Sequence, residues 1–305
     1  MVGAERSGTT LLRLMLDHHP VLTFHHESEF MVSQMPDGGG WPDMQAYRAW
    51  RQTDRVFLHS RFDIDELLDY PELMASFLEQ KRSRDDKIHV GATIHYGFDR
   101  LLRIWPSARF IHVVRDPRDV APSVIQMGWA GNAWAAVERW VDAERTWSKV
   151  VAETDPSQRI VIRYADLIED CEGTLRNICR FLGLEYSDRM LAYPEHSSYT
   201  LPDVNRLRRW QTRLPDRDVQ LVEARVGGLL EARGFEPSGL PALQVSEWKR
   251  RWLELQSHMA RARHRMRQYG LRLYLQELLA RRMGWTGLMQ RIRPRLHQVE
   301  EAALR

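Results

Sequence analysis

The segment from Gly3 to Gly8 and the two threonines after it carry groups that bind anions. Two glycines five positions apart allow a tight loop whose backbone N–H groups point inward. The apolar residues at 11–16 predict a helix that follows the loop directly, so the loop lies at a helix N-terminus. Such a terminus has unpaired N–H donors and the positive end of the helix dipole. Side-chain donors suited to phosphate or sulfate come from Arg6, Ser7, Thr9 and Thr10.

The spacing of this loop is that of a P-loop, although Thr9 occupies the position where nucleotide triphosphatases have lysine. We therefore predict a phosphate-binding loop that is not an ATPase site. A plain helix cap has a similar Gly-, Ser- and Thr-rich composition, and the loop alone leaves this alternative open.

A second candidate anion site follows the apolar, β-branched run at 110–114, which is typical of a buried parallel strand. Arg115 marks the C-terminal end of this strand, where open α/β sheets bind ligands. Pro117 suits the first turn of a helix that carries Ser123. Arg115 and Ser123 could bind one phosphate from two sides. The alternative is a surface salt-bridge cluster formed by Asp116, Arg118 and Asp119.

Together these segments resemble the sulfotransferases that use 3′-phosphoadenosine 5′-phosphosulfate. In that family an Arg-Ser-Gly-Thr-Thr loop holds the 5′-phosphosulfate, and a strand-end arginine with a serine eight residues later holds the 3′-phosphate. The run Ile-Arg-Tyr-Ala-Asp-Leu at 162–167, followed by Phe-Leu-Gly at 181–183, resembles a third family segment. The resemblance spans about residues 3–235 and implies a P-loop-like, three-layer α/β/α fold with a central parallel sheet. It implies donor binding by Arg6, Ser7, Gly8, Thr9, Thr10, Arg115, Ser123 and Tyr164.

The resemblance is strongest to the protein-tyrosine sulfotransferases, in which a glutamate twenty-one residues after the loop arginine acts as base. Counting from Arg6 reaches Glu27, which becomes the candidate general base beside Arg6. A metal site or a polar turn formed by His25, His26 and Glu27 is the alternative. Adjacent histidines on a strand point to opposite faces, which disfavours the metal site, and we predict none.

Two other positions bear on the donor site. Ala92 stands where the family has a lysine that helps stabilise the transferring group, which leaves this role to Arg6, His95 or another basic group. Many family members close a basic loop over the 3′-phosphate, and the resemblance implies Arg208 and Arg209 as its counterparts here.

Composition is that of an ordinary globular protein: 305 residues, 43% hydrophobic and 28% charged. Two cysteines, no apolar run of roughly 18 residues and no visible signal peptide favour a cytoplasmic location. Only Met1 and Val2 precede Gly3, although a P-loop follows a strand. Either that strand is missing or these two residues pair minimally.

The region from 245 to 305 differs from the domain predicted at 1–240, because it has 14 Lys and Arg against 5 Asp and Glu. Gly270, Gly284 and Gly287 would divide it into about three amphipathic helices. Such an extension can contact an anionic membrane, bind nucleic acid, dimerise or pack on the domain. We predict peripheral membrane contact and no nucleic-acid partner, with the packed appendage as the plainer alternative.

The sequence thus predicts transfer of a sulfuryl group from 3′-phosphoadenosine 5′-phosphosulfate to a hydroxyl, with Glu27 as base and Arg6 stabilising charge. The acceptor would be a carbohydrate, glycolipid, small molecule or peptide tyrosine, and the oligomeric state is not predicted. The alternatives are a P-loop-like kinase or nucleotide hydrolase, and a non-catalytic protein that binds membrane or nucleic acid through its basic extension.

Overall fold

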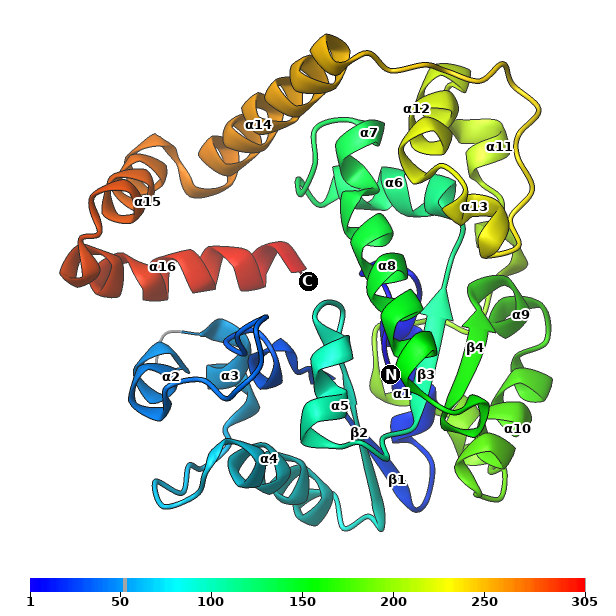
Figure 1. Cartoon of the computed structure of the whole chain (residues 1–305), viewed down its shortest axis with the longest axis vertical. Helices are drawn as coiled ribbons and strands as arrows, with labels where there is room; N and C mark the ends of the chain where they lie inside the picture. The colour runs from blue at the N-terminus through cyan, green and yellow to red at the C-terminus, as the bar shows by residue number, and fades with distance from the viewer. Residues whose placement is uncertain (52–53, 305) are drawn as a thin grey trace.

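Four short parallel strands form the centre of the protein (Figure 1). A computed structural model describes residues 1–51 and 54–304. Strand β1 (Leu22–Glu27) pairs with β2 (His89–Thr93), and β3 (Phe110–Val114) pairs with β4 (Arg159–Arg163). The strand predicted at 110–114 is confirmed as β3. The sequence pattern at 159–163 also predicts a parallel strand, and these residues form β4.

Val2 connects the two strand pairs. It forms parallel bridges to Ile94 beyond β2 and to His112 in β3. Its N–H donates to the carbonyl of Ile111 at 2.8 Å, and its carbonyl accepts the N–H of Val113 at 2.8 Å. Met1 and Val2 therefore lie between β2 and β3 and pair with both sides.

Helices surround these strands. Those of the main body are α1 (Thr9–Asp17), α2 (Met44–Arg51), α3 (Arg55–Ser60), α4 (Tyr70–Arg84), α5 (Leu101–Ile104), α6 (Pro117–Gln126), α7 (Ala133–Ala136), α8 (Glu138–Glu153), α9 (Tyr164–Glu169), α10 (Cys171–Leu182), α11 (Trp210–Arg213), α12 (Asp216–Val226) and α13 (Leu229–Ala232).

Strand β3 is buried on both faces. Successive side chains of a strand point to opposite sides, so the residues of β3 belong to two different apolar clusters. Phe110 and Val114 belong to the apolar cluster that includes residues of α6, α7 and α8. Ile111 and Val113 belong to the other cluster, with residues of α1, α9 and α10. Helices therefore cover β3 on both sides, which explains its continuous apolar sequence.

The helical sequence patterns at about 133–154 and about 216–233 each predict one continuous helix, and the structure interrupts both. The helix predicted at about 133–154 is split into α7 and α8 at Val137, and the one predicted at about 216–233 is split by Gly227, which has a φ of 55°. The tryptophans of the first pair, Trp134, Trp140 and Trp147, are buried, as expected of a core stripe.

The C-terminal extension consists of α14 (Glu247–Tyr269), α15 (Leu271–Met283) and α16 (Thr286–Leu304). Breaks occur at Gly270 and Gly284, whereas Gly287 lies inside α16. Figure 1 shows the three helices as an arch, coloured orange to red, that turns back toward the body. No helix in the described ranges is both long and apolar enough to cross a bilayer.

Helix α14 is docked closely on the loop between α6 and α7. The N–H of Gly131 donates to Ser257 Oγ at 3.0 Å, and the side-chain amide of Asn132 donates to the Leu253 carbonyl at 2.7 Å. A Cβ at Gly131 would lie 2.4 Å from Ala260 Cβ, so a glycine is required for this approach. The extension is therefore packed on the body along one face of α14.

The free energy of unfolding should fall as the pH drops below about 6.5, because His25 is buried as a neutral imidazole. Burial, with smaller effects of nearby His26, Lys81 and Arg13, lowers the pKa of His25 to about 3. The unfolded chain takes up this proton near pH ~6.5, whereas the folded chain does not. The stabilisation is complete above that pH and decreases by up to ~1.4 kcal/mol per pH unit below it.

Thermal unfolding of the protein and of His25→Gln, followed by circular dichroism between about pH 7.5 and about pH 5, measures this effect. Glutamine can still bond to Ser28, which His25 Nδ1 contacts at 2.9 Å, but does not titrate. The variant should show a shallower decline in melting temperature. Identical declines would contradict the assignment to His25.

Candidate functional site

The loop from Gly3 to Gly8 runs close to β3 and to α9. Gly3 has a φ of 143°, and a Cβ there would lie 2.2 Å from the Val113 carbonyl oxygen. Gly8, the N-cap of α1, has a φ of 97°, and a Cβ there would lie 2.3 Å from the ring of Tyr164. Both positions therefore require glycine for conformation and for space.

The three sequence segments converge around this loop. Arg6 Nε donates to Ser123 Oγ at 2.8 Å, across 117 positions of the chain. Arg115 donates to the Arg6 carbonyl at 3.3 Å, and its guanidinium lies 4.4 Å from the centre of the Tyr164 ring. The loop, the end of β3, helix α6 and the start of α9 thus meet at one place.

A cavity of about 150 Å³ opens at this meeting point. Its lining includes Arg6, Gly8, Thr9, Thr10, Arg115, Ser123, Tyr164, Tyr199, Asp203 and Arg206. Beside it, the buried Ser7 Oγ and Arg115 Nε have no hydrogen-bond partner among the described residues. Unpaired buried donors are costly, and an oxyanion would satisfy them. These donors fit a phosphate or sulfate ligand.

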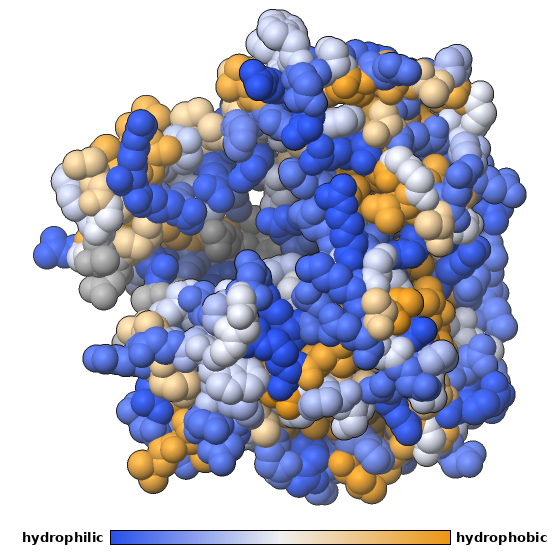
Figure 2. All heavy atoms as spheres, in the orientation of Figure 1, coloured by the Kyte–Doolittle hydropathy of each residue, from blue (hydrophilic) through white to orange (hydrophobic). Residues whose placement is uncertain are grey.

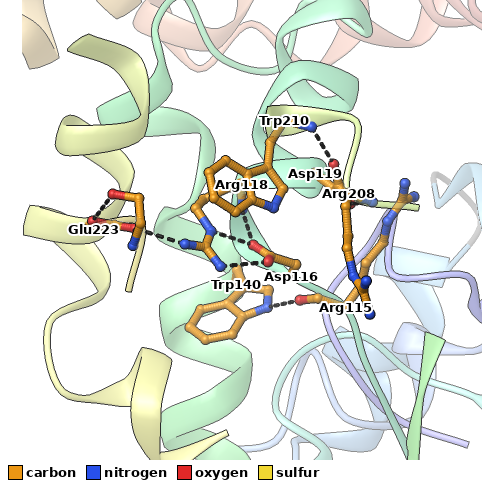
Figure 3. Close-up of polar contacts among 9 residues, drawn as sticks. Arg115, Asp116, Arg118, Asp119, Trp140, Arg208, Trp210 and Glu223 are labelled. Carbon is orange, nitrogen blue, oxygen red and sulfur yellow. Dashed lines mark hydrogen bonds and ion pairs between the residues drawn. The ribbon is translucent and has the colours of Figure 1, made fainter. Parts of the chain in front are cut away.

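The basic loop after residue 200 is anchored by Asp119 (Figure 3). Its carboxylate accepts the backbone N–H groups of Arg208 at 3.0 Å and Trp210 at 2.9 Å. Burial raises the pKa of Asp119 above its ordinary value, and the two N–H donors and Arg115 oppose this rise. The anchor holds the loop next to Arg115.

The arginines of the basic loop lie in different surroundings. Arg206 lines the 150 Å³ cavity, and its carbonyl accepts from Arg115 at 3.5 Å. Arg208 lines a neighbouring cavity of about 500 Å³ and pairs with Glu169 at 3.7 Å. Arg209 precedes α11 and lines neither cavity. Sequence reasoning named Arg208 and Arg209 and did not single out Arg206.

The cluster around Arg118 is internal. Arg118 is 2% exposed, pairs with Asp116 at 2.7 Å and with Glu223 at 2.8 Å, and stacks on Trp210 at 3.8 Å (Figure 3). The alternative of a surface salt-bridge cluster is therefore wrong for this residue, because its guanidinium joins α6 to α12 and to the basic loop. This contact fixes α6, and with it Ser123.

Glu27 ends β1 at an irregularity in the pairing with β2, and its side chain is exposed. It does not line the 150 Å³ cavity. A second glutamate, Glu29, is buried and accepts the backbone N–H of His95 at 2.9 Å. Burial raises the pKa of Glu29, His95 lowers it, and Glu27 raises it further. The two carboxylates therefore share one electrostatic environment.

His95 contacts the loop directly. Its Nδ1–H donates to the Gly3 carbonyl at 2.9 Å, which leaves Nε2 as the acceptor of the neutral ring. Ala92 of β2 contributes no charge from its side chain. His95 is thus the basic side chain that the structure places against the loop from β2.

The histidines before Glu27 are packed together. The rings of His25 and His26 lie 4.3 Å apart, and His26 lies 5.5 Å from His59. Within the described part of the chain no group of three or more His, Cys, Asp or Glu residues is placed to hold a metal ion.

Comparison with known proteins shows which family the sequence resembles. Residues 1–188 match the model of the sulfotransferase family. The chain belongs to the sulfotransferase family. It is 32% identical over 154 residues to the omega-hydroxy-beta-dihydromenaquinone-9 sulfotransferase of Mycobacterium tuberculosis, an alignment covering 44% of this chain and 40% of the relative. It is 25% identical to the protein-tyrosine sulfotransferase 2 of Gallus gallus, over 78% of this chain and 69% of the relative.

A solved structure shows the same fold. The sulfotransferase domain from the curacin biosynthetic pathway superposes with a TM-score of 0.50 at 16% identity, covering 77% of this chain and 96% of that one. The chain spans only 40% of the length of the menaquinone sulfotransferase that it matches. Family membership and an α/β sulfotransferase fold follow from these comparisons.

Proposed function

We propose that the protein transfers a sulfuryl group from 3′-phosphoadenosine 5′-phosphosulfate to a hydroxyl group. The observation that carries this proposal is the convergence of Arg6, Arg115 and Ser123 on one cavity with unpaired donors beside it. Membership of the sulfotransferase family supports it. The strands covered by helices on both faces support a P-loop-like, three-layer arrangement.

Each group of donors has its own part in binding. Arg115 and Ser123 hold the 3′-phosphate, with Arg206, Arg208 and Arg209 adding positive charge from the loop. The ring of Tyr164 packs against the Arg115 guanidinium in a cation–π contact. The N–H groups and hydroxyls of Ser7, Gly8, Thr9 and Thr10 hold the 5′-phosphosulfate at the N-terminus of α1. Binding the remote phosphate orients the group that reacts.

Glu27 accepts the proton of the acceptor hydroxyl. The acceptor oxygen forms a bond to sulfur while the bond from sulfur to the 5′-phosphate oxygen breaks. The electron pair of that bond stays on the phosphate oxygen, and 3′-phosphoadenosine 5′-phosphate leaves. Arg6 and the N–H groups of the loop stabilise the charge that develops on the transferring group and on the leaving oxygen. Glu27 suits this role because its exposed carboxylate is solvated, whereas burial favours the protonated form of Glu29.

The acceptor carries a hydroxyl group. The relatives are named for a hydroxylated menaquinone and for protein tyrosine, which both present one. Two free thiols support a reducing, cytoplasmic setting: Cys171 is half-buried and Cys179 is buried.

The extension also has a surface suited to a membrane. Along α14, Trp248, Trp252, Leu255 and Met259 are exposed at spacings of four, three and four residues, which places them on one side of the helix. The stripe that docks on the body, Leu253 and Ser257, is on another side. Exposed apolar side chains among many arginines are typical of helices that lie on anionic bilayers. We propose peripheral contact with such a surface.

Arg115→Ala should remove the preference for a donor with a 3′-phosphate. Calorimetric titration compares 3′-phosphoadenosine 5′-phosphate, adenosine 5′-phosphate, and ATP with magnesium. Loss of a charge-assisted bond should weaken binding of the first compound roughly 10- to 100-fold and leave the second almost unchanged. Arg109→Ala, at the opposite end of β3, is the matched control and should change neither. Equal loss for both nucleotides, or tightest binding of ATP with magnesium, would contradict the proposed donor site.

Glu27→Gln should lower kcat by about two orders of magnitude or more without changing donor affinity, because it removes the proton acceptor. Transfer is measured with a tyrosine peptide and a hydroxylated menaquinol as acceptors. Glu29→Gln is the comparison, since glutamine keeps an oxygen for the His95 N–H. A larger loss of kcat in Glu29→Gln than in Glu27→Gln would assign the base to Glu29.

Replacing Trp248 and Trp252 together by serine should reduce binding to vesicles containing phosphatidylglycerol more than tenfold, because two exposed aromatic side chains that would insert into the bilayer are lost. Co-sedimentation with neutral and anionic vesicles measures this effect. The control replaces Leu67 and Ile88, which are also highly exposed but lie on the body. Unchanged binding would exclude this face of α14, and concentration-dependent dimers without vesicles would indicate a second copy of the chain.

A further inference from the structure

A basic cavity of about 380 Å³ lies between the body and the C-terminal extension. Its walls come from α3, the segment after α6, the start of α8, and the second half of α14. In Figure 2 hydrophilic side chains border part of the hollow between the arch and the body. The charged and ring-bearing residues that line the cavity are Arg55, Trp129, Arg139, Arg261, His264, Arg265 and Tyr269.

The lining has four arginines and no carboxylate among the described residues. Two carboxylates lie behind it: Glu5 pairs with Arg139, and Glu277 is 3.9 Å from Arg265. Glu277 is engaged more closely by Arg281, at 2.6 Å. Arg261 is half-buried and has no hydrogen bond or ion pair within the part of the chain that is described. The guanidinium of Arg261 therefore adds a positive charge to the lining that a bound anion would neutralise.

The cavity is held in shape by close packing. A Cβ at Gly128 would lie 2.2 Å from the ring of His264, so this wall of α14 is pressed against the body. Arg139 stacks on Trp129 at 5.5 Å. Together with the bonds from Gly131 and Asn132 to α14, these contacts fix the helix that carries Arg261 and Arg265 before any ligand arrives. A pre-formed arrangement lowers the cost of ordering side chains on binding.

The cavity is adjacent to the proposed reaction centre. Arg139 pairs with Glu5, the residue before Arg6 of the loop. Helix α6 carries Ser123 and ends at Gln126, which itself lines the cavity. On the other wall, Arg55 contributes to the electrostatic environment of His26, next to Glu27. The cavity is therefore near both the donor loop and the proposed base.

We propose that this cavity binds an anionic group of the acceptor, a phosphate, sulfate or carboxylate, while the acceptor hydroxyl reaches Glu27. The C-terminal extension then completes the acceptor site through Arg261 and Arg265. This assignment of a substrate class rests on the proposed sulfuryl transfer, but the anion site itself can be tested without turnover.

The test uses the full chain saturated with 3′-phosphoadenosine 5′-phosphate, so that the donor loop is filled, and titrates inorganic pyrophosphate by calorimetry. Arg261→Ala should weaken pyrophosphate binding about tenfold or more, and Arg261→Lys should restore much of it. Arg263→Ala is the matched control, because Arg263 is exposed on the same helix and does not line the cavity. Thermal unfolding checks that each variant is folded.

Equal pyrophosphate affinity in the protein, Arg261→Ala and Arg263→Ala, or no binding once the donor site is filled, would overturn the proposal. If phosphatidylglycerol vesicles compete with pyrophosphate, the anion belongs to a lipid headgroup. If they do not, it belongs to a soluble acceptor. Failure of 3′-phosphoadenosine 5′-phosphate to bind, with Arg261-dependent pyrophosphate binding intact, would instead refute the proposed donor site and leave the anion site standing.

Discussion

The pairing of Val2 between β2 and β3 is the constraint on which the site depends. Two backbone hydrogen bonds to β3 and the contact of Met1 with Ile94 hold the two strand pairs side by side. The loop begins at the next residue, so its start is fixed against Val113, where only glycine fits. Because β3 ends at Arg115, the same contact brings the loop and this arginine together. A shift in this pairing would move the loop away from Arg115 and Ser123.

The run from Arg115 to Asp119 divides its charges between binding and support. Arg115 faces the 150 Å³ cavity, whereas Arg118 is buried between Asp116 and Glu223. Asp119 accepts two backbone N–H groups and so positions the loop that carries Arg206. Trp140 of α8 adds a bond from its indole N–H to the Arg115 carbonyl at 3.0 Å (Figure 3). Arg115, the proposed binding arginine, is thus oriented by neighbours whose own charges are satisfied internally.

The elements that depend mainly on neighbouring residues in the chain could be predicted from the sequence. An apolar β-branched run predicted β3 with its correct ends, and the glycine spacing predicted a loop at the start of α1. Motifs also predicted that Arg6, Arg115, Ser123 and Tyr164 meet, which the structure shows. The break at Val137 was missed because residues 133–154 have a uniform helical pattern, and only packing against α6 and α12 interrupts it.

Other features of the site depend on contacts between distant segments. Arg206 lines the cavity instead of Arg209 because Asp119 fixes the register of the loop, and no spacing in the sequence reports a bond across 89 positions. The hydrogen bond between Glu29 and His95 could not be predicted from the sequence for the same reason, because 66 positions separate the two residues. A charged residue in this sequence is not always exposed. Three charged side chains are buried: Arg51, Arg118 and Glu144.

The extension shows why net charge alone is a weak guide to function. The many arginines of the extension predicted a solvated or membrane-facing surface. In the structure, the arginines of α14 point to different sides of the helix. Gly128 and Gly131 allow α14 to approach the body closely, which turns Arg261 and Arg265 toward Arg139 and encloses a cavity. The apolar stripe at Trp248 and Trp252 lies on another side of the same helix. One amphipathic helix can therefore face the body, a bound anion and an external surface at once, because a helix presents its residues in all directions around its axis.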